Sequence, residues 1–144
     1  MSEAVAAVPP RLQEIVEEFK LCEGQEKLEL LLEYAEKLPP LPDWLDKNND
    51  MDQVHECMTP VFVQAELKNG EILFYFDVPP QSPTVRGYAA ILSEGLRGAT
   101  PEQVLNLPHS FYYEMGLQQV ITGQRLRGMD GILAHLKRLA RGYN

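Results

Sequence analysis

The stretch VFVQAELKNGEILFYFD, residues 61–77, decides the fold. Apolar and polar residues alternate on both sides of Asn69-Gly70, the dipeptide preferred in a two-residue type I′ turn. A turn of this length pairs Lys68 with Glu71 and Ala65 with Phe74. The same register gathers six apolar side chains on one face: Val63, Ala65, Leu67, Ile72, Phe74 and Phe76. Turn chemistry and hydrophobic pattern agree, so the stretch predicts an antiparallel hairpin.

The segment before the hairpin is expected to supply a further strand. Two strands alone are only marginally stable in water, and we therefore predict a third from part of the segment Met51 to Glu56. The end of that strand delivers Cys57 to the junction between a loop and the hairpin. Pro60 has no backbone N–H and favours an extended conformation at Thr59, which suits the start of the next strand.

Helices are predicted on either side of these strands. After Pro9-Pro10, apolar residues recur at helical spacing, and after Gly24 the spacing repeats. These two series are Leu12, Ile15, Val16, Phe19, and then Leu28, Leu31, Leu32, Ala35, Leu38. The wet face of the second helix is expected to carry Glu26, Lys27, Glu29, Glu33 and Lys37, and Cys22 is expected in the core. Pro39 to Pro42 ends this helix as a rigid connector, with an SH3-type ligand as the alternative, and Trp44 and Leu45 are expected to pin the connector to the body.

The second half of the chain predicts helices with recognisable starts. Ser82-Pro83 places an N-cap before a proline and opens a helix that ends near Gly98. Thr100 with Gln103 forms a capping box. A brief helical piece from Phe111 stops at Gly116, and a last helix carries Leu126, Met129, Leu133, Leu136 and Ala140. The residues from Thr122 to Gly128 are expected to form a polar, basic connection before it.

These elements predict an α+β fold in which a small, about three-stranded antiparallel sheet packs against helices. At 144 residues the chain is expected to be a single domain, residues 1–144, with residues 1–8 as a loose N-terminus. The formal charge of −8 argues against a general nucleic-acid binder. No apolar run approaches the length of a membrane-spanning helix. Two cysteines and the lack of a secretory signal favour the cytoplasm.

Cys57 is the side chain most suited to chemistry, because it lies on a loop where another molecule can reach a thiolate. The sequence lacks GxGxxG, P-loop, CxxC and HExxH motifs, so no cofactor is expected. A zinc site with His55 is disfavoured because Cys22, His109 and His135 are scattered, and no metal is expected. Three interpretations remain open on these residues alone: a sulfur carrier, a Cys-dependent hydrolase, and a pure interaction module with an incidental cysteine.

Several stretches together resemble the SufE family, the sulfur-acceptor partners of cysteine desulfurases. The opening helices that end in Leu38-Pro39-Pro40-Leu41-Pro42 look like the start of that family, and Val54-His55-Glu56-Cys57-Met58-Thr59-Pro60-Val61-Phe62 is similar to its cysteine motif. Asp77, Arg86-Gly87 and Thr100-Pro101-Glu102 match further family positions. The segment Leu117 to Gly128, with Arg125 and Gly128, resembles a later motif. The resemblance covers about residues 10–142.

The resemblance implies a fold related to the IscU scaffold and a role in sulfur transfer. It implies that Cys57 accepts persulfide sulfur from a SufS-like, pyridoxal-phosphate-dependent cysteine desulfurase, activates that enzyme, and passes sulfur to an iron–sulfur cluster assembly scaffold. The pyridoxal phosphate belongs to the partner, and the protein acts as an accessory carrier rather than as an enzyme. Neither nucleic acid nor membrane is an expected partner.

The resemblance also suggests which residues meet the desulfurase. Cys57 is the expected persulfide acceptor, and the expected partner-binding residues are His55, Glu56, Met58, Thr59, Asp77, Arg86 and Arg125. The alternatives are a solvated loop charge for Arg125, a strand-end charge for Asp77 and a first-turn helix residue for Arg86. The sequence departs from the family pattern at Glu56, where Gly is usual, at Thr59, where Ser is usual, and at Gly123, where Pro is usual. A Gly before the cysteine permits a positive φ that Glu tolerates poorly, so the loop is expected to differ in shape.

Overall fold

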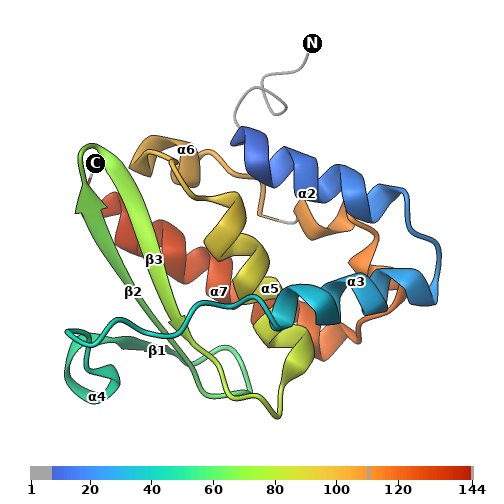
Figure 1. Ribbon diagram of the computed structural model, residues 1–144, viewed down its shortest axis with the longest axis horizontal. Helices are drawn as coiled ribbons and strands as arrows, with labels where there is room; N and C mark the ends of the chain where they lie inside the picture. Colours follow the sequence, from blue (N-terminus) through green and yellow to red (C-terminus); the bar gives the residue numbers. More distant parts are fainter. Residues whose placement is uncertain (1–7, 110, 144) are drawn as a thin grey trace.

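The structure is a computed structural model that describes residues 8–109 and 111–143. The expected loose terminus, except for Val8, lies outside these residues. The chain runs from the N-terminal helices α2 and α3 through the sheet to the C-terminal helix α7 (Figure 1). The helices are α2 Pro10–Lys20, α3 Gln25–Ala35, α4 Lys47–Asp50, α5 Pro83–Gly95, α6 Pro101–Leu105 and α7 Gly123–Arg141, with 3₁₀ turns η1 Phe111–Tyr113 and η2 Leu117–Gln119. The strands are β1 Asp52–Val54, β2 Val61–Lys68 and β3 Glu71–Asp77.

The sheet has the predicted antiparallel order β1-β2-β3. Lys68 pairs with Glu71 and Ala65 with Phe74, as the turn requires. Asn69 and Gly70 have φ values of 55° and 83°, the left-handed conformation of a type I′ turn. The predicted third strand is confirmed as β1, which pairs with the start of β2. Leu67 pairs with Ile72 and shares the apolar face, as predicted, but it is 41% exposed because the tip of the hairpin extends past the core.

The helices form layers around α5, whose buried residues occupy almost its whole circumference. Helices α2 and α3 pack on α5, while α7 packs on β1, β2 and α5. Figure 1 shows α5 between the sheet on one side and α2 and α3 on the other, with the strands crossing α7 in this view. Burial of apolar side chains from all of these elements forms one core.

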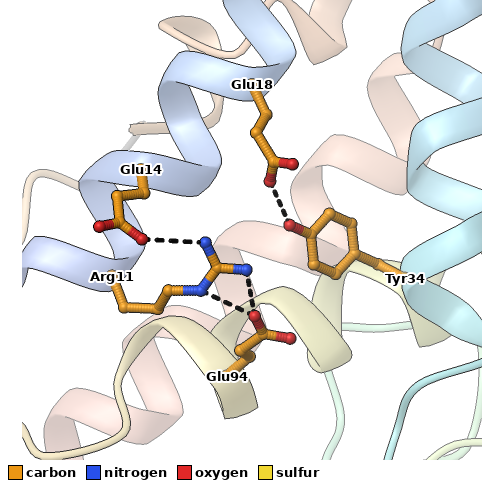
Figure 2. Close-up of polar contacts among 5 residues, drawn as sticks. All are labelled: Arg11, Glu14, Glu18, Tyr34 and Glu94. Atoms are coloured by element: carbon orange, nitrogen blue, oxygen red, sulfur yellow. Dashed lines mark hydrogen bonds and ion pairs between the residues drawn. The ribbon is translucent and has the colours of Figure 1, made fainter.

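Polar contacts at the rim of the core hold the N-terminal helices in place. Figure 2 shows Arg11 of α2 reaching Glu94 of α5, with Nε 2.7 Å from Oε2, and Glu14 on its own helix. In the same view the Tyr34 hydroxyl of α3 donates to Glu18 of α2. These contacts join three helices, and they also account for the high pKa of Tyr34, which burial and the bond to Glu18 both raise.

Two expectations about the helices are wrong. The polar segment from Thr122 to Gly128 is not a connection but the cap and first turns of α7, because Thr122 Oγ1 accepts from Arg125 N and Leu126 is buried. Lys27 is not on the wet face but is 6% exposed, and its Nζ donates to the carbonyls of Phe19 and Cys22. That ammonium group adds a charged donor to the Phe19 carbonyl, which also accepts from Cys22 N at 3.1 Å, and to the Cys22 carbonyl just beyond α2.

Smaller differences concern single side chains. Cys22 is partly buried rather than in the core. Leu45 is buried as expected, whereas Trp44 is 60% exposed and meets Tyr75 edge-on, with ring centroids 5.5 Å apart. The capping box of Thr100 and Gln103 is present. Ser82 precedes α5, but its side chain makes no capping bond.

Candidate functional site

The candidate site is built where the loop after β1 meets the first turns of α5 and α7, toward the lower edge of Figure 1. The loop, residues 55–60, leaves the sheet at Val54 and returns at Val61. Its backbone makes one weak hydrogen bond, from Cys57 N to Val54 O at 3.4 Å. The loop is therefore held mainly by side chains.

Cys57 lies beneath this loop and not on its surface. Its side chain belongs to the core cluster and the residue is 9% exposed. The thiol is therefore shielded in the free protein, a point that the sequence did not determine. Gly128, in the second turn of α7, makes room for the sulfur, because a Cβ built on Gly128 would lie 3.1 Å from Cys57 Sγ. A residue larger than glycine at this place would crowd the thiol.

The loop residues around Cys57 point the other way. His55 and Glu56 are exposed, and Met58 is 81% exposed. The Met58 sulfur meets the amide group of Gln124 at the start of α7. The site thus presents a large apolar side chain to solvent immediately beside a shielded thiol.

Thr59 joins the loop to the start of α5. Its hydroxyl donates to Ser82 Oγ at 3.0 Å, and Ser82 does not cap its own helix. The two residues are far apart in sequence, so their periodicity and capping patterns gave no sign of this contact.

Glu56 lies against the next turn of α7. A Cβ on Gly131 would come within 2.6 Å of Glu56 Cβ, so the glycine leaves the space that the Glu56 side chain occupies. The Glu56 carboxylate is 3.9 Å from an Arg138 nitrogen, a long ion pair between exposed groups. Beside it, His135 Nε2 lies 3.2 Å from an Asp52 oxygen and Arg138 contacts His135 Nδ1.

Arg125 and Arg86 have different surroundings. Arg125 is exposed in the first turn of α7, and its Nη1 donates to Thr84 Oγ1 at 2.9 Å. Arg86 is partly buried and donates to two backbone carbonyls, Ala35 O at 3.2 Å and Val78 O at 2.6 Å. Asp77 forms an ion pair with Lys47 at 3.4 Å. Arg125 therefore joins the first turns of α7 and α5, whose neighbouring residues Gln124 and Ser82 contact the Cys57 loop. Arg86 and Asp77 make contacts within the fold.

A cleft opens next to the loop. It is lined by Glu56, His109, Arg127, Asp130, Gly131 and Ala134. Among these, only Glu56 and His109 were candidates for chemistry from the sequence. The helical spacing of 127, 130, 131 and 134 would have been visible only if α7 had been expected to begin at Gly123. A smaller hollow of about 160 Å³ lies between Pro39-Pro40, β3 and α5, without any loop residue.

The arrangement favours some chemistries over others. Within residues 8–109 and 111–143, no group of three His, Cys, Asp or Glu side chains is placed to hold a metal ion. No helix in that part of the chain has the length and apolar character needed to cross a bilayer. Among the same residues, no histidine nitrogen hydrogen-bonds the Cys57 sulfur, as a nucleophile and its base would. The feature of the site most suited to chemistry is the shielded Cys57 thiol, which lies under a loop held by side chains.

Known proteins of one family are similar to this chain in sequence. Residues 13–140 match the family model described as SufE, Fe-S metabolism associated domain. An uncharacterized SufE-like protein of Mycobacterium tuberculosis is 40% identical over 139 residues, which is 96% of each chain. A protein named cysteine desulfuration protein SufE, from Plasmodium vivax, is 26% identical over 132 residues, or 89% of this chain and 52% of that one.

A solved structure is similar over nearly the whole chain. The solution structure of a hypothetical protein from Thermus thermophilus has a TM-score of 0.83 and 41% identity, and the match covers 94% of this chain and 96% of that one. The three-stranded sheet with its surrounding helices is therefore an architecture found in a related solved protein.

Proposed function

Because the chain belongs to the SufE family, whose members serve sulfur transfer in Fe-S metabolism, we propose that Cys57 is the residue at which this protein accepts sulfur. The donor is a persulfide on a pyridoxal-phosphate-dependent cysteine desulfurase. The protein stimulates that enzyme and delivers the sulfur to an iron–sulfur cluster assembly scaffold. It acts as a carrier in the cytoplasm, and the pyridoxal phosphate stays with the desulfurase.

The observation that carries the proposal is the position of Cys57 beneath a short loop at the edge of the fold. A thiol that is 9% exposed is protected from adventitious oxidation. It is nevertheless one loop away from solvent, since residues on both sides of it are exposed. Both properties suit a carrier whose thiol reacts with one partner protein and is protected from other reactants.

The transfer itself is a thiol exchange. The Cys57 thiolate attacks the terminal sulfur of the desulfurase persulfide, and a bond forms between Cys57 Sγ and that sulfur. The bond between the terminal sulfur and the desulfurase cysteine breaks, and the desulfurase sulfur leaves as a thiolate. Cys57 then carries the persulfide, and no net oxidation or reduction occurs.

The loop must open for this attack, and its contacts are weak enough to allow the opening. The Glu56–Arg138 pair is 3.9 Å long and exposed, and exposed pairs contribute about 0–1 kcal/mol. The Thr59–Ser82 bond has a typical net value of about 1 kcal/mol. Contact with the partner over His55, Glu56, Met58 and Thr59 replaces these interactions and draws the thiol outward.

Arg125 is proposed to meet the desulfurase next to the loop, because its exposed guanidinium makes a single bond to Thr84 Oγ1. Asp77 and Arg86 remain candidates for this surface on the resemblance alone. The two carbonyl bonds of Arg86 favour an internal structural role for it instead.

The decisive experiment is incubation with a cysteine desulfurase and L-cysteine, followed by mass spectrometry. We expect Cys57 to gain the mass of one sulfur atom and desulfurase turnover to rise. Cys57→Ser should abolish both effects, whereas Cys22→Ser, which removes the other free thiol, should abolish neither.

Other outcomes identify the rival functions. Hydrolysis of an ester or amide without a desulfurase, lost in Cys57→Ser, would indicate a Cys-dependent hydrolase. Binding and activation of the desulfurase that survive Cys57→Ser would indicate an interaction module. Either result contradicts the carrier proposal.

A further inference from the structure

The cleft beside the Cys57 loop is open to solvent and has room for a small molecule. Four of its six lining residues, Arg127, Asp130, Gly131 and Ala134, follow the i, i+3, i+4, i+7 spacing of one face of α7. Glu56 and His109 form its sides. Its volume is about 810 Å³, within the range of sites that bind small molecules. The Glu56 side chain lies over Gly131, and Ala134 contributes only a methyl group to the wall of the cleft.

The charged groups of the cleft have opposite signs and do not neutralise one another. In the part of the chain that the structure describes, neither Arg127 nor His109 has a hydrogen-bond or ion-pair partner. Asp130 Oδ2 accepts from the Tyr112 hydroxyl at 3.1 Å, a neutral donor that leaves the negative charge in place. Within the described residues, Glu56 has only the long contact with Arg138. The cleft therefore offers groups of both signs to a ligand that carries both charges.

Asp130 is anchored for such a role. Its Oδ1 is buried without a hydrogen-bond partner in the structure, and the same is true of the Tyr88 hydroxyl. Burial and the charge of Asp130 both raise the pKa of Tyr88, so the hydroxyl stays neutral beside the carboxylate. Because Oδ1 is closed to solvent, an ammonium group in the cleft would stabilise the Asp130 carboxylate through its charge and not through a hydrogen bond to Oδ1.

The cleft is adjacent to the reacting sulfur. Glu56 precedes Cys57 in the chain and lies over Gly131, while Cys57 Sγ lies against Gly128 one turn earlier on α7. When the loop opens, Glu56 moves with it, and the wall between the cleft and the sulfur is removed. A ligand held between Arg127 and Asp130 is then close to Cys57.

We propose that this cleft binds a small zwitterionic thiol of the amino-acid class, which takes the terminal sulfur from Cys57. The ligand's ammonium group faces Asp130 and Glu56, and its carboxylate faces Arg127 and His109. This inference rests on the proposed function, because it needs a persulfide on Cys57. The protein would then have two kinds of sulfur acceptor: the assembly scaffold and a low-molecular-weight thiol.

The step balances without an oxidant or reductant. The ligand thiolate attacks the terminal sulfur of the Cys57 persulfide, and a sulfur–sulfur bond forms between them. The bond between that sulfur and Cys57 Sγ breaks, and Cys57 leaves as a thiolate. The products are the ligand persulfide and the regenerated carrier.

Binding is tested first, on a protein that cannot transfer sulfur. L-cysteine is titrated into the Cys57→Ser chain and followed by calorimetry and by NMR shifts of the α7 amides. We expect saturable binding that Arg127→Gln weakens about tenfold, as loss of one charged hydrogen bond implies, and that Ala134→Leu abolishes by filling the cleft. Arg97→Gln, an exposed arginine outside the cleft, should bind as before. Absence of binding overturns the inference whether or not Cys57 carries sulfur.

Transfer is tested second, on wild-type protein loaded with labelled sulfur by a desulfurase. L-cysteine should remove the label faster than 2-mercaptoethanol, which has no charged groups, and Arg127→Gln should slow only the reaction with L-cysteine, by about tenfold. Equal rates for both thiols, or equal slowing of both, contradict the inference. If Ala134→Leu instead blocks loading by the desulfurase and leaves L-cysteine binding intact, the cleft is a protein contact and the inference is wrong. Failure of Cys57 to load at all refutes the proposed function, and the binding experiment still decides whether the cleft is a site.

Discussion

Arg86 and Arg125 illustrate how two arginines from one family pattern take different roles. The guanidinium of Arg86 joins Val78 O, just after β3, to Ala35 O, at the end of α3. The guanidinium of Arg125 makes one bond to Thr84 Oγ1 from an exposed position. The number and burial of their partners predict opposite consequences of removing them.

Arg86→Gln is expected to lower the free energy of unfolding by about 2 kcal/mol, because the shorter side chain loses bonds from a charged donor to two carbonyls. Urea denaturation measures the change. Sulfur loading of the remaining folded protein should equal that of the wild type. Normal stability with impaired loading would instead make Arg86 a contact of the desulfurase.

Arg125→Ala is expected to weaken stimulation of the desulfurase, while the free energy of unfolding falls by less than about 1 kcal/mol, the typical net value of one hydrogen bond. Activation assays at several protein concentrations and a thermal melt provide the two readouts. Arg97→Ala, at another exposed position, serves as the control for loss of a surface charge. A large fall in stability would show that Arg125 is structural.

At this scale the sequence singled out Cys57 as the candidate thiol but did not predict its environment. The position of Cys57 at a loop–strand junction was visible from Thr59-Pro60 and the hairpin. Its burial depends on Gly128, and the fixing of its loop depends on Ser82. Both are contacts between segments that are distant in sequence, and hydrophobic periodicity carries no information on such contacts.

At the scale of elements, Lys27 shows how one side chain completes a helix. Its ammonium group lies at the end of α2 and binds Phe19 O at 2.8 Å and Cys22 O at 2.6 Å. Its aliphatic stem packs against Gly116, where an added Cβ would come within 2.6 Å of Lys27 Cε. A helical wheel places Lys27 with its charged neighbours, because a wheel contains no information on the carbonyls of α2 that the Lys27 side chain reaches.

Lys27→Met is expected to reduce the free energy of unfolding by about 2 kcal/mol, since the carbonyls at the end of α2 lose a charged donor. Lys20→Met is the matched control, because Lys20 is exposed and pairs with Glu17 at 3.4 Å, a contact that contributes about 0–1 kcal/mol. Chemical denaturation of both variants gives the comparison. Equal losses would mean that the buried bonds of Lys27 add nothing.

Elements with local signals were predictable, and those with competing signals were not. Asn69-Gly70 fixed the hairpin register without reference to the rest of the chain. The start of α7 was missed because Gly123 and Gly128 disfavour helix, although Thr122 caps it. Gly128 and Gly131 face the Cys57 loop, so the residues that weakened the helical signal are those that make room for the site.

At the scale of the whole molecule, three buried or hydrogen-bonded tyrosines make stability depend on alkaline pH. Burial and the bond to Glu66 raise the pKa of Tyr75 to about 12. Burial, as the main cause, also raises the pKa of Tyr34 and of Tyr88. In an unfolded chain a tyrosine has a pKa of about 10, so the unfolded state loses these protons first.

The free energy of unfolding is therefore expected to be constant below pH 10 with respect to these groups and to fall as pH rises from 10.0 toward 12. Urea denaturation across this range, with ultraviolet absorbance to follow tyrosinate, measures the decline. Tyr75→Phe should make the decline shallower. A free energy of unfolding that stays level through this range would contradict the assignment.

More of the overall architecture than of the site could be predicted from the sequence. The order of helices and strands and the ordered family motifs were enough to expect a small sheet against helices. The sequence did not predict that the loop lies against the first turns of α5 and α7, because this contact depends on how the helices cross in space.

The shortness of β1 has a consequence for how such a protein evolves. Three residues pair this strand to β2, and nothing in the described chain pairs its other side. The flap formed by β1 and residues 55–60 is thus expected to detach at a small fraction of the energy that global unfolding requires. Changes deep among the helices would then alter how much protein a cell retains, whereas changes along the flap would tune how readily sulfur is handed over, and selection can adjust the two separately.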